Sequence, residues 1–304
     1  MIKKNLIFLG LGKNQIRYIK QVNRKKNFII GLDKNNKNKS YVDFFIKHSI
    51  HNDNIKNIQD KLKRFNIEQI IYRSSGPTIL LAYALEKFYH KKRIDISLAK
   101  SIYSKANFCN FLKKNNFNFI KYKFKKNLKD NNFNKLKVLK PDSPLIGKKN
   151  IYIAKSFKKF EFNKCLKNSH NNKLIISDFI AGRDINAFFK KDKNKKIKLI
   201  SNFEEINIIS GNKIKENKII SPVKDINANT LNKINKTCVR LIKKFNNYYG
   251  LISITCRLTD LNKVIPYEIN VGLSGDNFAD KYYPKAYKKN LYIIELKTLI
   301  KNYI

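Results

Sequence analysis

Short apolar runs alternate with helical segments over the first hundred residues, and this alternation constrains the fold more than any other feature of the chain. Strand-like runs occur at 6–12, 28–33 and 69–73, and helical spacing follows at 14–24 and 78–90. Apolar runs without polar alternation are typical of parallel strands that are covered on both faces. The pattern therefore predicts an α/β domain with a Rossmann-like parallel sheet.

The pattern changes near residue 97, where we place a domain boundary. Residues 105–114 and 230–246 have helical spacing, and the runs around them resemble antiparallel strands separated by polar turns. These predicted strands cover 136–141, 151–154, 173–180, 186–189, 198–200 and 251–254. The expected fold class is thus α/β and α+β, with a Rossmann-like parallel-sheet domain at 1–97 and a second domain at 98–304.

A glycine turn after the first strand raises the alternative of dinucleotide binding. Gly10 and Gly12 precede a helix, and Asp33 ends the second strand at about the right distance. The third glycine of the fingerprint is absent, because position 15 is Gln15. Close packing of the helix on the strand needs that glycine, so the sequence disfavours NAD binding.

A carboxylate and a carboxamide stand two residues apart in the apolar run 264–271. Side chains alternate across a strand, so Glu268 and Asn270 point to the same face. Mg²⁺ takes only one or two protein oxygens and fills its shell with water and phosphate, so this pair is a candidate metal site. The alternative is a half-buried strand that ends in a loop, and Tyr267 and Ile269 fit ordinary packing.

The formal charge of +43 suggests an anionic partner, and nucleic acid is the first class to consider. The excess is mostly lysine spread along the chain, whereas dedicated nucleic-acid surfaces more often use clustered arginine. There is no tryptophan, and aromatic and basic residues do not interleave as they do on base-stacking platforms. We therefore expect small anions, nucleotides included, rather than nucleic acid.

The four cysteines lie far apart, and no CxxC pair occurs. This spacing argues against a zinc ribbon and a disulfide scaffold and fits a reducing cytoplasm. The four histidines have no metal-ligand spacing. The apolar run at the N-terminus is too short for a signal peptide, and none approaches the roughly 18 residues of a membrane span. The sequence therefore predicts a cytoplasmic protein without a membrane partner.

Five motifs in a fixed order resemble the ATP-grasp superfamily, especially its carboxylate–amine ligases and carbamoyl-phosphate-synthetase-like members. They are a lysine at a helix start, a strand ending in Lys-Pro, a glycine-containing loop, a Gly-x-acid segment and the Glu-x-Asn strand. In this chain they are Lys105, Lys140-Pro141, Ser143–Asn150, Asp178–Asp184 and Glu268–Asn270. The resemblance covers nearly the whole chain. It implies a two-lobed ATP-grasp domain at 98–304, with a small lobe at about 98–178 and a large lobe at about 179–304.

The resemblance implies that cations hold the phosphates of ATP. Transfer of a phosphoryl group to a carboxylate brings two anions together, so nearby positive charge is required. Lys105 and Lys140 would supply it. The loop that contains Ser143 and Gly147 would close over the phosphates with its backbone N–H groups.

The resemblance also implies an adenine site and a substrate site. Asp178, Phe179 and Ile180 would form a hinge that meets adenine through backbone hydrogen bonds, and Asp184 matches the acid of the family's Gly-x-Glu. Three residues after the metal strand are the candidate substrate contacts: Ser274, Gly275 and Asp276.

Two departures from the family concern the metal strand, where Glu268 and Asn270 would bridge one or two Mg²⁺ to ATP. The family usually carries another acid on the preceding strand, in the window that holds residues 254–256 here, and none of these is acidic. The family often continues Asn-Pro-Arg, whereas Gly272 stands at the arginine position. Arg257 is the candidate to replace that arginine as a catalytic residue.

The predicted function is an ATP-dependent ligase that forms an acyl phosphate from a carboxylate and joins it to an amine or another nucleophile. ATP and Mg²⁺ are the implied cofactors, and a small carboxylate and an amine are the implied partners. A homo-oligomer is compatible with this prediction. The two departures support an alternative, a nucleotide- or metabolite-binding protein of the same fold without turnover.

Overall fold

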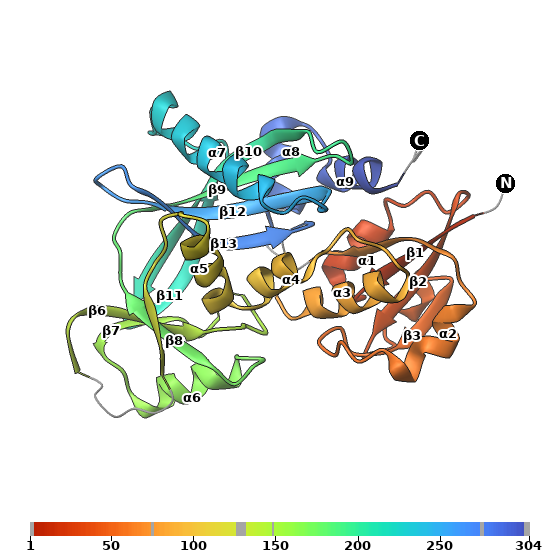
Figure 1. Ribbon diagram of the computed structural model, residues 1–304, viewed down its shortest axis with the longest axis horizontal. Helices are drawn as coiled ribbons and strands as arrows, with labels where there is room; N and C mark the ends of the chain where they lie inside the picture. The colour runs from red at the N-terminus through yellow and green to blue at the C-terminus, as the bar shows by residue number, and fades with distance from the viewer. Residues whose placement is uncertain (1–2, 74–75, 126–131, 148, 274–276, 301–304) are drawn as a thin grey trace.

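The computed structural model describes residues 3–73, 76–125, 132–147, 149–273 and 277–300, which form two β-sheets and the helices around them (Figure 1). The strands are β1 (Lys4–Leu9), β2 (Asn27–Asp33), β3 (Phe44–Lys47), β4 (Ile67–Tyr72), β5 (Tyr122–Lys125), β6 (Asn132–Pro141), β7 (Tyr152–Ser156), β8 (Leu174–Asp178), β9 (Arg183–Lys191), β10 (Ile197–Ser210), β11 (Lys213–Ile220), β12 (Gly250–Leu258) and β13 (Val264–Val271).

The helices are α1 (Lys13–Ile19), α2 (Gln59–Lys63), α3 (Thr78–Phe88), α4 (Ile96–Tyr103), α5 (Lys105–Lys114), α6 (Lys159–Lys167), α7 (Ala228–Lys243), α8 (Tyr283–Tyr287) and α9 (Leu291–Leu299), with short helical turns η1 (Lys39–Tyr41), η2 (Lys56–Ile58) and η3 (Phe278–Tyr282). None of the helices in the described ranges is long and apolar enough to cross a membrane.

The first sheet is parallel, as predicted, with the strand order β3-β2-β1-β4 in the described residues. The central strand β1 is apolar from Leu6 to Leu9, and these side chains are fully buried between the covering layers. Asp33 accepts a hydrogen bond of 2.7 Å at Oδ2 from the backbone N of Leu11. Asp33 therefore stabilises the glycine turn itself.

The second sheet is antiparallel and contains, in the described residues, nine strands in the order β13-β12-β9-β10-β11-β7-β6-β8-β5. One register pair, Lys213 with Tyr152, joins β11 to β7. Figure 1 shows β6, β7 and β8 with α6 on one side of this junction and β9, β10, β12 and β13 with α7 on the other. The predicted combination of a parallel sheet with an antiparallel part is confirmed.

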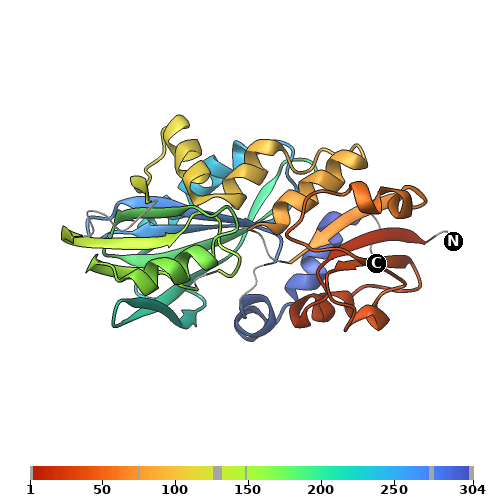
Figure 2. The same ribbon diagram turned by 90° about the horizontal axis from the view of Figure 1, so that it is seen from below.

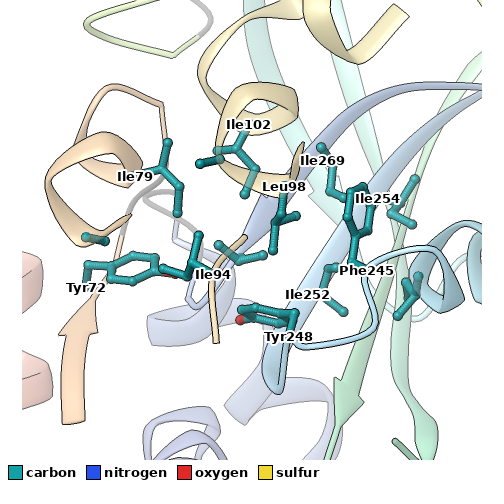
Figure 3. Packing of buried hydrophobic residues seen from close by; sticks show 14 of the residues in the cluster. Tyr72, Ile79, Ile94, Leu98, Ile102, Phe245, Tyr248, Ile252, Ile254 and Ile269 are labelled. Atoms are coloured by element: carbon teal, nitrogen blue, oxygen red, sulfur yellow. The ribbon is translucent and has the colours of Figure 1, made fainter. Parts of the chain in front are cut away.

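The two sheets share one hydrophobic core. Tyr72, Ile79 and Leu98, from β4, α3 and α4, belong to the same buried cluster as Ile252 and Ile269 from β12 and β13 (Figure 3). The domain boundary placed near residue 97 falls inside α4, and it and the lobe division near 178 stay predictions. The shared core fixes β12 and β13 relative to the first sheet.

The C-terminal helices return to the first sheet, and Figure 2 shows them beside it. Tyr18 in α1 donates a hydrogen bond of 2.8 Å to Oε2 of Glu295 in α9. Arg73, which is fully buried at the end of β4, forms an ion pair with Asp280 and donates a hydrogen bond to Tyr292. The chain therefore completes the packing of its first sheet with its last helices.

Candidate active site

A cavity of about 280 Å³ lies between the two groups of strands in the antiparallel sheet, near the lower end of the range for small-molecule sites. Its apolar lining comes from β6, β10, β11, β7 with the residue before it, and the segments before β5 and after β8: Ile120, Val138, Ile151, Ile153, Phe179, Ile180, Ile206, Ile209 and Ile214. Its charged and phenolic lining includes Lys105, Lys140, Asp178, Arg183, Asp184, Glu204, Glu205, Arg257, Tyr267 and Glu268. Apolar walls with a few convergent charges suit a ligand that has a flat apolar part and an anionic part.

Asp142 brings the two predicted phosphate-binding lysines together. It follows Lys140 at the end of β6, and its carboxylate accepts hydrogen bonds from Ser104 Oγ at 2.9 and 2.8 Å and from Ala106 N at 2.8 Å. Ser104 is the N-cap of α5, so this buried carboxylate anchors the start of the helix beside the strand end. Lys105 therefore emerges next to Lys140, and sequence analysis had assigned no role to Asp142.

The neighbourhood of the two lysines is strongly cationic. Burial, together with the charge of Lys105, lowers the pKa of Lys140 to about 8. Lys105 Nζ lies 3.3 Å from Oε2 of Glu268, which also lines the cavity. An anionic ligand at this point would stabilise the charged form of Lys140.

Glu268 and Asn270 lie on the same face of β13, as the sequence predicted. Asn270 Nδ2 donates a hydrogen bond of 3.1 Å to Oε1 of Glu268. The residue opposite Glu268 on β12 is Thr255, which donates a hydrogen bond of 2.9 Å from Oγ1 to Asn186 Oδ1. Among the described residues, no group of three or more His, Cys, Asp and Glu side chains could hold a metal ion.

This donor set fits one Mg²⁺ that is coordinated mainly by phosphate and water. One carboxylate and one amide carbonyl match the small number of protein ligands that Mg²⁺ usually accepts in nucleotide sites. Glu268 is the charged donor, and its side chain is about one third exposed, at 34%. The residue opposite it on β12 is Thr255, which offers a hydroxyl group and no carboxylate.

Tyr267 lines the cavity beside Glu268. Strand register pairs Thr255 with Glu268 and Cys256 with Pro266, which leaves Tyr267 as the extra residue of a β-bulge. Pro266 lacks an N–H, and β13 is an edge strand of the described sheet, where proline is tolerated. Burial, followed by the nearby carboxylates of Asp184 and Glu205, raises the pKa of Tyr267.

Arg257 and Asp184 form an ion pair across β12 and β9. Arg257 Nε and Nη2 donate to the two carboxylate oxygens at 2.8 and 3.0 Å, and Nη1 donates to the carbonyl of Ile180 at 2.6 Å. Both residues line the cavity. The structure therefore places the predicted catalytic arginine against the predicted hinge, and its catalytic role stays a prediction.

The predicted hinge segment between β8 and β9 packs closely against β12 at a glycine. Gly182 has φ +140°, and an added Cβ would lie 2.2 Å from the carbonyl oxygen of Leu258. Phe179 N donates a hydrogen bond of 3.0 Å to Leu136 O, and Asp178 forms an ion pair with Lys137. The hinge is thus held close to both neighbouring strands, with Asp178, Phe179 and Ile180 in the cavity wall.

Several predicted site residues are not part of the cavity lining. Ser143 is fully buried, does not line the cavity, and accepts a hydrogen bond of 2.8 Å at its carbonyl from His170 N. Gly147 is also not in the cavity lining, and none of the described residues beyond its chain neighbours has an atom within 4 Å of the place of its Cβ. The predicted substrate contacts at 274–276 lie outside the described residues.

Two acids of β10 that had no predicted role also belong to the site. Glu204 accepts from Arg183 Nε at 2.8 Å and from Nη2 at 2.7 Å, and Glu205 lies opposite Asp184 on β9. Both glutamates line the cavity. A signal was present, since two adjacent acids within a strand are unusual in a chain with 22 acidic and 65 basic residues.

Comparison by sequence finds no matching family model and no matching curated protein. Comparison by structure finds many matches. An L-amino acid ligase from Bacillus licheniformis aligns with a TM-score of 0.78 and 14% identity over 98% of this chain and 75% of that chain. A D-Ala:D-Ser ligase from Enterococcus faecalis aligns with a TM-score of 0.67 and 12% identity over 100% of both chains.

A third match is the biotin carboxylase domain of 2-oxoglutarate carboxylase from Hydrogenobacter thermophilus, in complex with MgADP, ADP and bicarbonate. It aligns with a TM-score of 0.71 and 11% identity over 98% of this chain and 70% of that chain. These proteins are ATP-grasp enzymes. The chain therefore has the ATP-grasp fold, and the predicted resemblance is confirmed at that level.

Proposed function

We propose that this protein is an ATP-dependent ligase that forms an acyl phosphate from a carboxylate and joins it to an amine or another nucleophile. The observation that supports this most strongly is the meeting of Lys105, Lys140 and Glu268 in one cavity with apolar walls. Two cations and one metal-binding carboxylate are the groups that a triphosphate with Mg²⁺ requires. The ligase activities of proteins with the same fold support the reaction class.

In this proposal the apolar walls hold adenine, and the backbone of Phe179 and Ile180 orients it. Lys105 and Lys140 bind the phosphates and offset the charge that builds up when a carboxylate approaches. Glu268 and Asn270 would hold Mg²⁺, which when bound polarises the phosphate oxygens. The loop with Ser143 and Gly147 has no phosphate contact in this proposal, because neither residue lines the cavity.

A phosphate-release screen tests the proposal directly. Purified protein is incubated with Mg·ATP and panels of amino acids, sugar acids and small carboxylates, each with and without an amine. We expect phosphate release that depends on one carboxylate, and a loss of at least about a hundredfold in Glu268→Gln, since a metal ligand is removed. If the wild-type protein does not bind Mg·ATP in equilibrium dialysis, the proposed function is wrong.

A second candidate function is nucleotide or metabolite binding without turnover. It is favoured by Thr255, whose hydroxyl occupies the position opposite Glu268 and donates to Asn186. It is also favoured by Arg257, whose guanidinium is bound to Asp184 and Ile180. ATP binding of ordinary affinity, with no phosphate release for any member of the screen, would support this candidate over the ligase.

A further inference from the structure

We propose that the ion pair between Lys105 and Glu268 keeps metal away from Glu268 in the nucleotide-free protein. Metal binding and nucleotide binding thereby depend on each other. The proposal rests on the proposed function, because it concerns the same cavity. Lys105 acts here as a positioning residue that controls the availability of the metal-binding carboxylate.

Both carboxylate oxygens of Glu268 are engaged by neighbouring side chains. Oε2 lies 3.3 Å from Lys105 Nζ, and Oε1 accepts a hydrogen bond of 3.1 Å from Asn270 Nδ2. The Lys105 side chain is only 14% exposed, so this ion pair is less screened by water than a surface pair. A divalent cation that binds alone must displace this ammonium group from the carboxylate.

Lys105 has few places to go in this cavity. Once separated from Glu268, its ammonium group would remain near Lys140, which lines the same cavity. Repulsion between the two cations makes that arrangement unfavourable without an anion. Phosphate oxygens would remove this cost, because they offer both lysines an opposite charge.

A nucleotide that binds without metal also meets an unfavourable charge. Without a metal, the phosphates would draw Lys105 away from Glu268. They would then lie close to the negative charge of the Glu268 carboxylate. When metal and nucleotide bind together, Lys105 moves from Glu268 to phosphate, and Glu268 binds the metal. Each ligand therefore increases the affinity for the other, and by thermodynamic linkage the two factors are equal, typically about 5–150-fold.

Metal binding to the nucleotide-free protein tests the proposal. Mn²⁺ is the probe, because it accepts the same oxygen ligands as Mg²⁺, and free Mn²⁺ can be measured by electron paramagnetic resonance. We expect Lys105→Met, which keeps the length but removes the charge, to bind Mn²⁺ about tenfold more tightly than wild type. Lys105→Arg, the charge-preserving control, should stay near wild type, and Glu268→Gln should abolish the gain when combined with Lys105→Met.

The coupling is then measured by titrating ADP with and without Mn²⁺. Wild type should show a mutual enhancement, equal in both directions, that is several-fold smaller in Lys105→Met. An unchanged or weaker Mn²⁺ affinity of Lys105→Met, with native circular dichroism, would overturn this proposal whether or not ADP binds. Failure of wild type to bind ADP at all would instead refute the proposed function, and with it the coupling, even if the Mn²⁺ result stood.

Discussion

Arg257 and Asp184 lie opposite each other on β12 and β9 and are joined by two hydrogen bonds of 2.8 and 3.0 Å. The same guanidinium binds the carbonyl of Ile180, so one side chain connects the sheet to the hinge segment. Asp184 also accepts a hydrogen bond of 3.0 Å from Asn207 Nδ2. This arrangement preforms the wall of the cavity on which the proposed adenine site depends.

We expect a strong energetic coupling between Arg257 and Asp184. Arg257→Met leaves a buried carboxylate without its ion-pair partner and should lower the free energy of unfolding by about 3 kcal/mol. The double variant Arg257→Met with Asp184→Asn should lose clearly less than the sum of the single variants, with a coupling of about 1–3 kcal/mol. Urea unfolding of wild type, the two single variants and the double variant measures this coupling. Losses of unfolding free energy that simply add would show that the pair is not coupled.

Gly182→Ala should be among the most damaging small substitutions in this chain. Its Cβ would lie 2.2 Å from a backbone oxygen, at a φ of +140° that other residues rarely adopt. We expect a loss of at least about 3 kcal/mol in the free energy of unfolding. Gly211→Ala is the matched control, because Gly211 also has a positive φ, +57°, but nothing lies within 4 Å of its Cβ position. A loss of about 1 kcal/mol is expected there, and equal losses at the two sites would contradict the argument.

Nucleotide affinity should fall at alkaline pH. Burial and the charge of Lys105 lower the pKa of Lys140 to about 8. The protonated form of Lys140 therefore predominates only below that pH in the free protein. Because phosphate binds the protonated form, the affinity for ADP should decrease as pH rises above 8, by up to about tenfold per pH unit. Titrations between pH 7 and pH 10 in wild type and Lys140→Arg measure this. The arginine variant should flatten the profile, and a profile as steep as that of wild type would assign the effect to another group.

Glu295 should make the folded state less stable as pH rises toward neutrality. Burial raises the pKa of its carboxyl to about 7, although Tyr18 donates a hydrogen bond to it. The folded protein therefore binds this proton more tightly than the unfolded chain does. The resulting stability is fully present below the unfolded pKa of about 4.5 and is lost as pH rises through about 7.

Replacing Glu295 by glutamine should remove this contribution, since the amide keeps an acceptor for Tyr18 but does not ionise. We expect the stability of Glu295→Gln relative to wild type to be greater at pH 8 than at pH 5, by about 1–3 kcal/mol. Urea unfolding at both pH values measures the difference. A stability difference between the two proteins that does not change with pH would contradict the assignment.

The elements that sequence analysis predicted were those with a strong local signal. The run around Leu6–Leu9 is apolar throughout, and α5 begins at the expected Lys105 because Ser104 caps it. The strand β3 was missed because it has four residues, of which only Ile46 is buried. The helix α4 was missed because the boundary was placed within it, although Asp95 caps it by accepting from Leu98 N at 2.7 Å.

In the candidate site, too, some features follow from local sequence signals and others depend on tertiary contacts. The face shared by Glu268 and Asn270 follows from strand alternation, which depends on neighbouring residues alone. The position of Tyr267 breaks that alternation, because a bulge is defined by the register with β12. Glu204 and Glu205 line the cavity, and Asp142 anchors the start of α5, through contacts with residues distant in sequence, so their spacing along the chain does not place them at the site.

By itself, the sequence determined the parallel first sheet, the presence of an antiparallel part, and the types of residue that could bind a nucleotide and Mg²⁺. Burial and alternation of side chains are local properties, and they can be read along the chain. Only the tertiary structure decided which charges meet. It places Lys105 beside Glu268, Arg257 against Asp184, and Thr255 opposite Glu268. Ion pairing depends on distances across the sheet, and strand order and register fix those distances.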